Sequence, residues 1–281
     1  MMFSKPIEEI IISRKSVRTY NNTTLSDDQK AQINQYLKHV ESPFEGVLRF
    51  KLIDKENNKD SSTKIGTYGI IHGVKHFICI AIKKQDSDAA FNLGYSFEKI
   101  VLFLASINLG TCWLGGTFNK GDFASAMQLQ EDEMLPIVSP VGKAANNKSL
   151  IEKMMRGVAG SDNRKPFSTI FFLNNFDTPL TEEMAAEYKL PLEMVRLAPS
   201  ASNKQPWNIV KSNNDFHFYI NNKAGYSVPL YDFSKNDLGI AMCHFELTAI
   251  EKGLKGKWIN DPTLAIAKDA NHGYVRTWKT E

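Results

Sequence analysis

Two basic segments have the residue types that bind anionic oxygens. Arg14, Ser16 and Arg18 occupy every second position of one short segment, so in an extended chain they would face the same way. Two guanidiniums with a hydroxyl between them suit a phosphate, because arginine offers a planar, bidentate fork to anionic oxygens. A second cluster, Asn163-Arg164-Lys165, could converge on the same anion. The alternatives are a solvated surface for the first segment and an exposed linker for the second.

Two further segments could contact a flat, heteroaromatic ligand. Leu109–Phe118 contains the pair Gly115-Gly116, and glycines without a Cβ let backbone amides come close to a ring. Ala198–Trp207 is rich in small hydroxyl and amide groups, which can hydrogen-bond to the polar edge of such a ring. The alternatives are a helix C-cap with a tight turn for the first, and a helix-to-strand loop with a buried tryptophan for the second.

The composition argues against several other classes of protein. With 281 residues, of which 42% are hydrophobic and 23% charged, the chain can bury a large globular core. The net charge of +3 is too small and too evenly spread to indicate nucleic-acid binding. No apolar run approaches the ~20 residues that cross a bilayer, and the first residues do not resemble a secretion signal.

The cysteines and histidines give no sign of metal or disulfide chemistry. Cys79, Cys112 and Cys243 are isolated, so neither a disulfide framework nor a thiolate zinc site is expected, and a reducing, cytoplasmic location is the default. The six histidines lack metal-ligand spacing. The chain also has no Gly-x-Ser-x-Gly elbow and no Walker-type phosphate loop, so hydrolase and nucleotide-triphosphatase functions have no support in the residues.

A faint internal repeat predicts the elements that position these segments. A helix beginning at Asn92-Leu-Gly and ending near Trp113 aligns with a second that begins at Asp237-Leu-Gly and closes near Trp258, each 145 residues later. Two helix starts, at Ser26 and Thr181, are 155 residues apart. The ten extra residues of the first half are expected in the polar loop at 57–63. Chance similarity of two helices is the alternative explanation.

Six runs between the helices have the pattern of strands. They are Val47–Ile53, Phe77–Ile82, Ile137–Val141, Ser168–Leu173, Trp207–Lys211 and Phe216–Ile220. Strands and helices mixed in this way predict an α+β fold built from two related halves, residues 1–175 and 176–281.

Taken in order, the segments resemble the motifs of the FMN-dependent nitroreductase family. The matching residues are Arg-x-Ser-x-Arg at 14–18, Leu-Gly-Thr-Cys-Trp followed by a glycine pair at 109–116, and Pro-Ser-x-x-Asn-x-Gln-Pro-Trp at 199–207. The resemblance implies an α+β fold whose FMN lies across the interface of a homodimer. It also implies a cofactor-binding set of Arg14, Lys15, Ser16, Arg18, Gly115, Gly116, Arg164, Lys165, Pro199, Ser200, Ala201, Ser202 and Asn203.

The motifs are divided between the two halves. The first half has the Arg-x-Ser-x-Arg segment but only Ser42-Pro43-Phe44-Glu45-Gly46 in place of the Pro-Ser loop, whereas the second half has the Pro-Ser loop and no Arg-x-Ser-x-Arg segment. The chain therefore looks like a nitroreductase dimer fused into one polypeptide, similar to the single-chain, tandem-half members. The expectation is a monomer, an internal pseudo-dimer, with one composite FMN site per chain.

The resemblance implies an oxidoreductase in which NAD(P)H reduces FMN and a nitroaromatic, quinone or related small acceptor is then reduced. Its partners would be small molecules, with no nucleic acid and no membrane. No side chain stands out as a catalytic acid or base, and no metal is implied. The alternatives are a flavin-binding sensor or carrier without turnover, and a structural pseudo-dimer that binds no flavin.

Overall fold

Two compact units make up the computed structural model. Its described residues are 3–55, 66–86, 88–146, 163–228, 231–266 and 270–281. Unit 1 comprises Met1–Lys5 and Ser13–Ala159, and unit 2 comprises Pro6–Ile12 and Gly160–Glu281. The units therefore differ from the expected halves, because residues 6–12 and 160–175 belong to unit 2. The expected loop at 57–63 lies outside the described residues.

Unit 1 is built on a four-stranded antiparallel sheet in the order β1-β2-β4-β3. Phe50 lies opposite Ile80, and Cys79 lies opposite Val138. The strands are β1 (Leu48–Asp54), β2 (His76–Lys83), β3 (Gly110–Thr111) and β4 (Glu133–Gly142). The first, second and fourth match predicted runs, and β3 is too short to show a period in the sequence.

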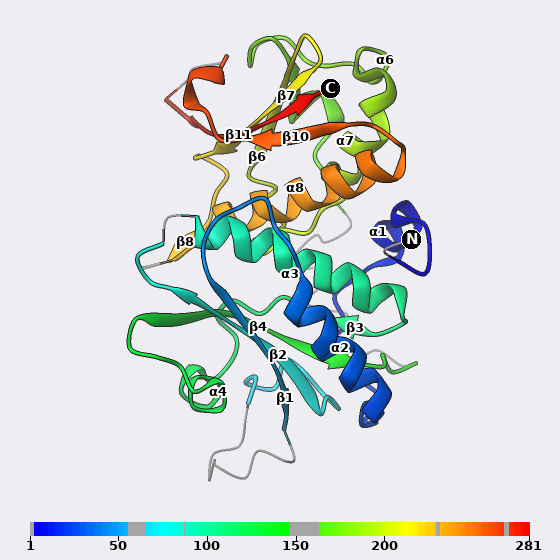
Figure 1. Cartoon of the computed structure of the whole chain (residues 1–281), viewed down its shortest axis with the longest axis vertical. Coiled ribbons are helices and arrows are strands. Elements are labelled where there is room, and N and C mark those ends of the chain that lie inside the picture. Colours follow the sequence, from blue (N-terminus) through cyan, green and yellow to red (C-terminus); the bar gives the residue numbers. More distant parts are fainter. Residues whose placement is uncertain (1–2, 56–65, 87, 147–162, 229–230, 267–269) are drawn as a thin grey trace. The chain divides into compact units, whose positions relative to one another are not determined.

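Helices of unit 1 pack against this sheet (Figure 1). They are α2 (Asp27–His39), α3 (Ala89–Ser106) and α4 (Lys120–Met127). Alternate residues of β2 point to opposite faces, and Phe77 packs edge-on against Phe123 of α4. Every residue of α3 except Ala105 is buried, including Glu98. A charged residue buried in an apolar helix needs a partner, which makes Glu98 a residue of interest.

Unit 2 has a five-stranded sheet in the order β10-β11-β7-β6-β5. Every neighbouring pair is antiparallel except β5 with β6, which is parallel. The strands are β5 (Phe171–Leu173), β6 (Trp207–Ser212), β7 (Asp215–Asn221), β10 (Gly256–Ile259) and β11 (His272–Thr280), with a separate two-stranded ribbon of β8 (Ser227–Val228) and β9 (Tyr231–Asp232).

Helix α8 (Phe233–Glu251) forms the core of unit 2 together with this sheet. Phe245 of α8 packs against the rings of Phe216, Phe218 and Trp278. The other helices are α1 (Ile7–Ser13), α6 (Glu182–Ala185) and α7 (Lys189–Arg196), with 3-10 turns at η1 (Phe167–Thr169), η2 (Ala186–Tyr188), η3 (Ala201–Asn203) and η4 (Pro262–Leu264).

Helix α1 belongs to unit 2 although it precedes unit 1 in the chain. Its side chains Ile7, Ile10 and Ile11 are buried. The carboxylate of Glu251, at the end of α8, accepts a hydrogen bond from the backbone nitrogen of Ile7 at 2.9 Å. A carboxylate at a helix N-terminus satisfies an otherwise unpaired N–H and complements the helix dipole.

The two units repeat one topology, which confirms the α+β fold with two related halves. In each, four strands are antiparallel, in the orders β1-β2-β4-β3 and β6-β7-β11-β10 along the sheets. Each also has a long buried helix between its second and third strands in the chain, α3 or α8. Strand β5 is the extra element of unit 2.

The expected helix boundaries are confirmed in part. Ser26 forms a complete capping box with Gln29, and the Thr181 side chain accepts a bond from the Met184 nitrogen. The expected end of the second long helix near Trp258 is wrong, since α8 ends at Glu251 and Trp258 lies in β10. Gly253 explains the earlier end, because it follows the C-cap Lys252 with a φ of 76°, the left-handed backbone that commonly ends a helix.

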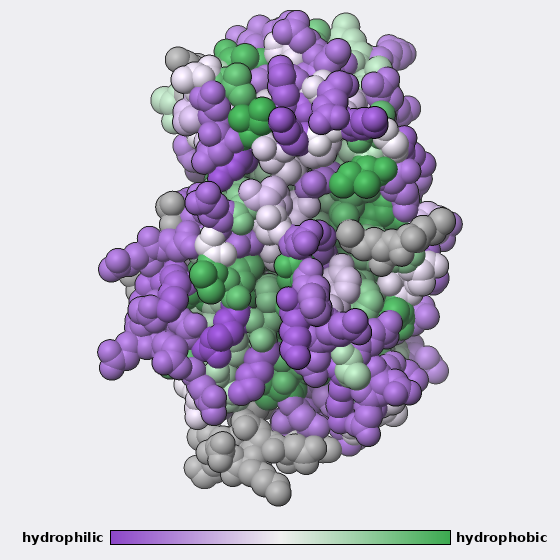
Figure 2. All heavy atoms as spheres, viewed as in Figure 1, coloured by the Kyte–Doolittle hydropathy of each residue, from purple (hydrophilic) through white to green (hydrophobic). Residues whose placement is uncertain are grey.

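None of the described helices is both long and apolar enough to cross a membrane. Hydrophilic residues cover most of the face shown in Figure 2, with smaller hydrophobic areas among them. The large hydrophobic side chains that are exposed, such as Ile12, Tyr68 and Ile250, occur in both units.

Candidate functional site

The Arg14–Arg18 segment lies beside the strand that leads to the glycine pair. Ser16 pairs with Thr111 of β3, and the backbone nitrogen of Val17 donates to the Thr111 carbonyl at 2.8 Å. A Cβ at Gly110 would come within 2.6 Å of Val17, so glycine at 110 permits this close approach. Unit 1 therefore brings together two of the segments that were singled out in the sequence.

The two guanidiniums of this segment have nitrogen atoms without acceptors. Val17 is buried in the core, whereas Arg14, Ser16 and Arg18 are partly exposed and Lys15 is exposed. The Nε atoms of Arg14 and Arg18 are both buried, and neither has a hydrogen-bond partner among the described residues. Buried polar groups are rarely left unsatisfied in native proteins, and unsatisfied ones suggest a role for a bound group.

Glu98 of α3 is the site residue that the sequence did not reveal. Its side chain has no exposed surface, and its Oε1 lies 3.8 Å from the Nε of Arg14. The indole Nε1 of Trp113 donates to its Oε2 at 3.1 Å. One buried carboxylate thus contacts the arginine segment and the start of the glycine turn. Its only signal in the sequence is a charged residue inside the apolar helix pattern.

The Gly115-Gly116 turn follows Leu114, which is fixed by two backbone hydrogen bonds with Val138 of β4. Gly116 is exposed, and a Cβ placed on it would meet no atom within 4 Å. Neither glycine has a positive φ, and α3 ends earlier, with Asn108 in the left-handed region. Neither the backbone of the turn nor the packing around it requires glycine at 116. The open space beside Gly116 is large enough for a Cβ, and a ligand could occupy it instead.

The Pro199–Asn203 loop of unit 2 has an unusual backbone. Ser202, Asn203 and Gln205 have φ values of 50°, 54° and 48°, in the left-handed region that costs a non-glycine residue roughly 1–2 kcal/mol. Such conformations persist only where surrounding contacts enforce them, and they cluster at ligand sites. The contacts that enforce this loop are therefore informative about its role.

Hydrogen bonds hold the loop at both ends. The backbone nitrogen of Ala201 donates to the carboxylate of Asp237 on α8, at 3.0 and 3.1 Å from its two oxygens. The backbone nitrogen of Gln205 donates to Ser200 Oγ at 2.9 Å. Burial is the main cause that raises the pKa of Asp237 well above its ordinary value, and the hydrogen bond from Ala201 opposes it.

The basic pair Arg164 and Lys165 lies with this loop in unit 2. Arg164 donates to Asn203 Oδ1 at 3.1 Å and to the Leu197 carbonyl at 3.2 Å. Lys165 Nζ donates to the Gln205 carbonyl at 2.9 Å, and burial lowers the pKa of Lys165. The expectation was that this pair serves the same anion as Arg14 and Arg18. The contacts described here are instead with the loop, and a phosphate contact stays a prediction.

Equivalent contacts hold the corresponding loop of unit 1. Asn92, which aligns with Asp237, donates from Nδ2 to the Gly46 carbonyl at 2.8 Å. Gly46 lies 155 residues before Ala201, the same offset as the two helix starts. Each long helix thus fixes its loop from the same position, with the donor on the helix in unit 1 and on the loop in unit 2. The side chain of Trp207 that follows the loop in unit 2 is fully buried, as the alternative interpretation expects.

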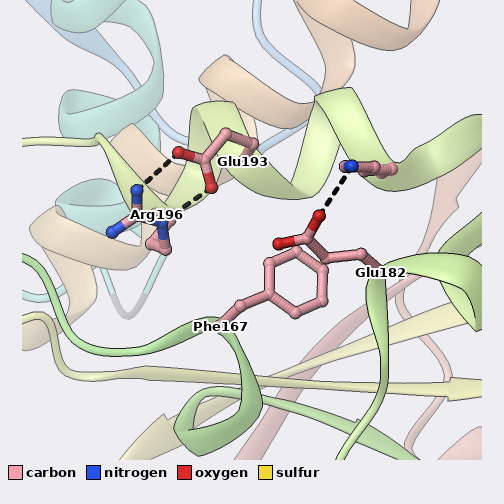
Figure 3. Close-up of a pocket in the computed structure, with 5 residues that line it drawn as sticks. Phe167, Glu182, Glu193 and Arg196 are labelled. Carbon is pink, nitrogen blue, oxygen red and sulfur yellow. Dashed lines mark hydrogen bonds and ion pairs between the residues drawn. The ribbon is translucent and has the colours of Figure 1, made fainter.

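A pocket of about 270 Å³ lies elsewhere in unit 2 and contains none of the predicted site residues. Figure 3 shows Phe167 beside two ion pairs, Glu193 with Arg196 and Glu182 with a lysine, Lys189. The hydrogen bond that Lys189 donates to Glu182 raises the pKa of Lys189, and those that Arg196 donates to Glu193 raise the pKa of Arg196. The charges of this pocket are paired, so we assign it no chemistry. The described residues also contain no group of three or more side chains able to hold a metal ion.

Comparison with known proteins identifies the family. The model of the family described as "Putative TM nitroreductase" matches residues 6–249. The chain therefore belongs to this nitroreductase family, a family of oxidoreductases. No curated protein matches the chain.

Solved structures of nitroreductases are similar to the chain. A "putative nitroreductase" from Thermotoga maritima MSB8 is 20% identical, with 98% of this chain and 94% of that chain covered, at a TM-score of 0.62. This likeness over the full length shows the fold. A nitroreductase family protein from Clostridium novyi NT is 17% identical over 53% of this chain and 91% of its own, with a TM-score of 0.42. A nitroreductase with bound FMN from Bacteroides fragilis NCTC 9343 is 16% identical over 52% and 92%, with a TM-score of 0.40.

Proposed function

We propose that the protein is an FMN-dependent NAD(P)H oxidoreductase that reduces nitroaromatics, quinones or related small acceptors. The observation that carries the proposal is that the Nε atoms of Arg18 and Arg14 are both buried and have no hydrogen-bond partner among the described residues. Both cations lie on the segment that pairs with β3, the strand before the glycine turn. An anionic group such as the FMN phosphate would provide the acceptors that these N–H groups lack.

The residues present fit FMN in three respects. Arg14, Ser16 and Arg18, with the exposed Lys15, offer cationic and hydroxyl groups to the phosphate. The open space at Gly116 allows a flat ring to lie against the Gly115-Gly116 backbone. The Pro199–Asn203 loop presents small polar groups. Arg164 and Lys165 stabilise it by hydrogen bonds to Asn203 and to Gln205 just after it.

Each group in this proposal has a role in binding or orientation. FMN, when bound, supplies the redox chemistry by accepting a hydride from a nicotinamide and delivering it to the acceptor. The arginines anchor the phosphate, and the glycine turn leaves room for the ring and directs backbone amides towards its edge. The Pro199–Asn203 loop fixes the orientation of the ring or ribityl chain. No side chain is assigned as an acid or base.

We further propose that one FMN is bound per chain and that the chain works as a monomeric pseudo-dimer in the cytoplasm. The support is the complementary distribution of the motifs. Unit 1 has Arg14-x-Ser16-x-Arg18, and unit 2 has the Pro199–Asn203 loop.

Anaerobic reduction of the FMN-loaded protein tests the function. NADH or NADPH is expected to bleach the oxidised flavin, and a quinone or nitroaromatic is expected to restore its colour, with ping-pong kinetics. A protein that binds FMN and is reduced by dithionite but by neither nicotinamide would instead be a flavin carrier or sensor. A protein that does not bind FMN would contradict the proposal as a whole.

A further inference from the structure

The buried carboxylate of Glu98 links two segments of the proposed flavin site. Its two oxygens have different neighbours, Arg14 Nε at 3.8 Å and Trp113 Nε1 at 3.1 Å. The Trp113 ring also packs edge-on against Phe97, with the ring centroids 4.6 Å apart. Trp113 is therefore fixed by a ring contact and a hydrogen bond, two residues before the glycine pair.

Burial strengthens the electrostatic interaction through which Glu98 orients Arg14. The Glu98 side chain has no exposed surface and that of Arg14 is only 9% exposed, so water screens their interaction little. Removing one member of a buried ion pair leaves the other without compensation. The carboxylate thus limits the positions that the Arg14 guanidinium can adopt, and the indole limits those of the chain entering the glycine turn.

Unit 2 contains a similar pair without the arginine segment. Trp258, which aligns with Trp113, donates from Nε1 to Glu246 Oε2 at 2.8 Å. The position that aligns with Glu98 is occupied by Cys243, so the carboxylate of unit 2 is three residues further along its helix. The Glu–Trp bond occurs in both units, and in unit 1 its carboxylate also faces Arg14 of the Arg-x-Ser-x-Arg segment.

We propose that Glu98 is a positioning residue. It holds Arg14 and the Trp113–Gly116 turn at a distance from each other that matches the distance between the phosphate and the ring of one flavin. The proposal rests on the FMN site proposed above. It assigns Glu98 no contact with the cofactor.

The sign of the change in FMN affinity tests this role. A carboxylate near a phosphate repels it, so if Glu98 acted by charge alone, Glu98→Gln would tighten FMN binding. If Glu98 positions Arg14 and the turn, Glu98→Gln raises the FMN dissociation constant. The expected rise is about tenfold, the equivalent of one charged hydrogen bond between Arg14 and the phosphate. The matched control is Glu246→Gln, which alters the Glu–Trp bond of unit 2 and should change the constant less than twofold. Titration of apoprotein measures both.

Riboflavin, which lacks the phosphate, separates the effect of Glu98 on Arg14 from its effect on Trp113. Arg14→Ala should weaken FMN binding and leave riboflavin binding unchanged. Trp113→Phe, which keeps the ring contact with Phe97, should weaken binding of both ligands. Glu98→Gln should weaken both, and in combination with Arg14→Ala it should weaken FMN binding by less than the product of the two single effects.

Other results would overturn the role of Glu98. They are an unchanged or tighter FMN affinity in Glu98→Gln, full additivity with Arg14→Ala, or an equal loss in Glu246→Gln, which would indicate general destabilisation. Failure of the proposed function looks different, because the wild-type protein would then bind neither FMN nor riboflavin. Thermal unfolding of each apoprotein confirms that the variants compared are folded.

Discussion

At the scale of single residues, the main feature of unit 1 is two buried guanidinium nitrogens, of Arg14 and Arg18, that have no hydrogen-bond partner among the described residues. A net hydrogen bond to a charged group contributes about 1.5–3 kcal/mol, and a buried donor left unpaired costs a similar amount. The Nε of Arg18 has neither an ion pair nor a hydrogen bond among the described residues, whereas that of Arg14 faces Glu98. A ligand phosphate therefore has most to contribute at Arg18.

Replacing Arg18 by alanine should raise the FMN dissociation constant roughly 10- to 100-fold, the equivalent of one charge-assisted hydrogen bond. The fold should survive, because the Arg18 Nε forms no hydrogen bond with the described residues. Lys38→Ala is the control, since it removes an exposed positive charge from α2 of the same unit. An unchanged dissociation constant in Arg18→Ala would show that the segment is not a phosphate site.

Asp237 should make stability depend on pH. Burial raises its pKa above the unfolded value of about 3.9, so the folded state holds the proton more tightly than the unfolded state. Stability is then lost as pH rises from the unfolded to the folded pKa. Asp237→Asn should remove this loss, because an amide oxygen can still accept from Ala201, and its melting temperature should exceed that of the wild type at neutral pH.

Melting curves between pH 3 and 8 measure this effect. The advantage of Asp237→Asn should shrink as pH falls through the unfolded pKa of about 3.9 and be smallest near pH 3, where the wild-type carboxyl is mostly protonated in both states. Asn92→Ala, at the aligned position of unit 1, removes a hydrogen bond to Gly46 but no titrating group, and should shift melting without changing its pH dependence. A parallel pH dependence in wild type and Asp237→Asn would contradict the assignment.

At the scale of elements, the Pro199–Asn203 loop depends on contacts from α8 and from residues 163–165. Ser202 and Asn203 of the loop, and Gln205 just after it, are left-handed without the freedom of glycine. Arg164 joins Asn203 to the Leu197 carbonyl just after α7. The loop is thus held by a side chain far away in sequence, in a conformation it would not adopt alone.

Replacing Arg164 by alanine should loosen this loop more than it destabilises unit 2. The charged hydrogen bonds to Asn203 and Leu197, worth about 1.5–3 kcal/mol each, would be lost, so amide hydrogen exchange at 201–205 should accelerate by roughly tenfold or more. Arg196→Ala is the matched control, because that guanidinium pairs with Glu193 in the separate pocket. Equal exchange rates in the loop of both variants would show that Arg164 does not hold it.

The sequence predicts elements well where their periodicity is local. Strands β2, β6 and β7 match their apolar runs, and Ser26 signals its capping box. Strand β11 was missed because Arg276 and Lys279 interrupt its apolar pattern, although Arg276 is buried in the structure.

The candidate site is predictable only in part, because its contacts join distant residues. The spacing of Arg14, Ser16 and Arg18 indicates an anion site by itself. The partner of Arg14 is 84 positions away on a helix whose pattern suggests only a core, so Glu98 gave no usable signal. Arg164 was identified as basic, but its role in holding Asn203 depends on a turn that the sequence does not define.

At the scale of the whole molecule, the two units repeat one topology but not one set of motifs. The arginine segment occurs in unit 1 and the Pro-Ser loop in unit 2. If both contribute to a single site, the binding stoichiometry is one. Flavin released by denaturation, divided by protein concentration, should therefore approach one FMN per chain. A value near two would show that each unit binds its own flavin.

The placement of α1 in unit 2 also has a consequence for synthesis on the ribosome. Ser13–Ala159 form one continuous stretch of unit 1 and can fold as they emerge, but Ile7 cannot meet Glu251 until nearly the whole chain has been made. At about 5–20 residues per second, that delay is roughly 10–50 s. During it, the three isoleucines of α1 lack the unit 2 residues that bury them, and chaperones and neighbouring nascent chains can reach them.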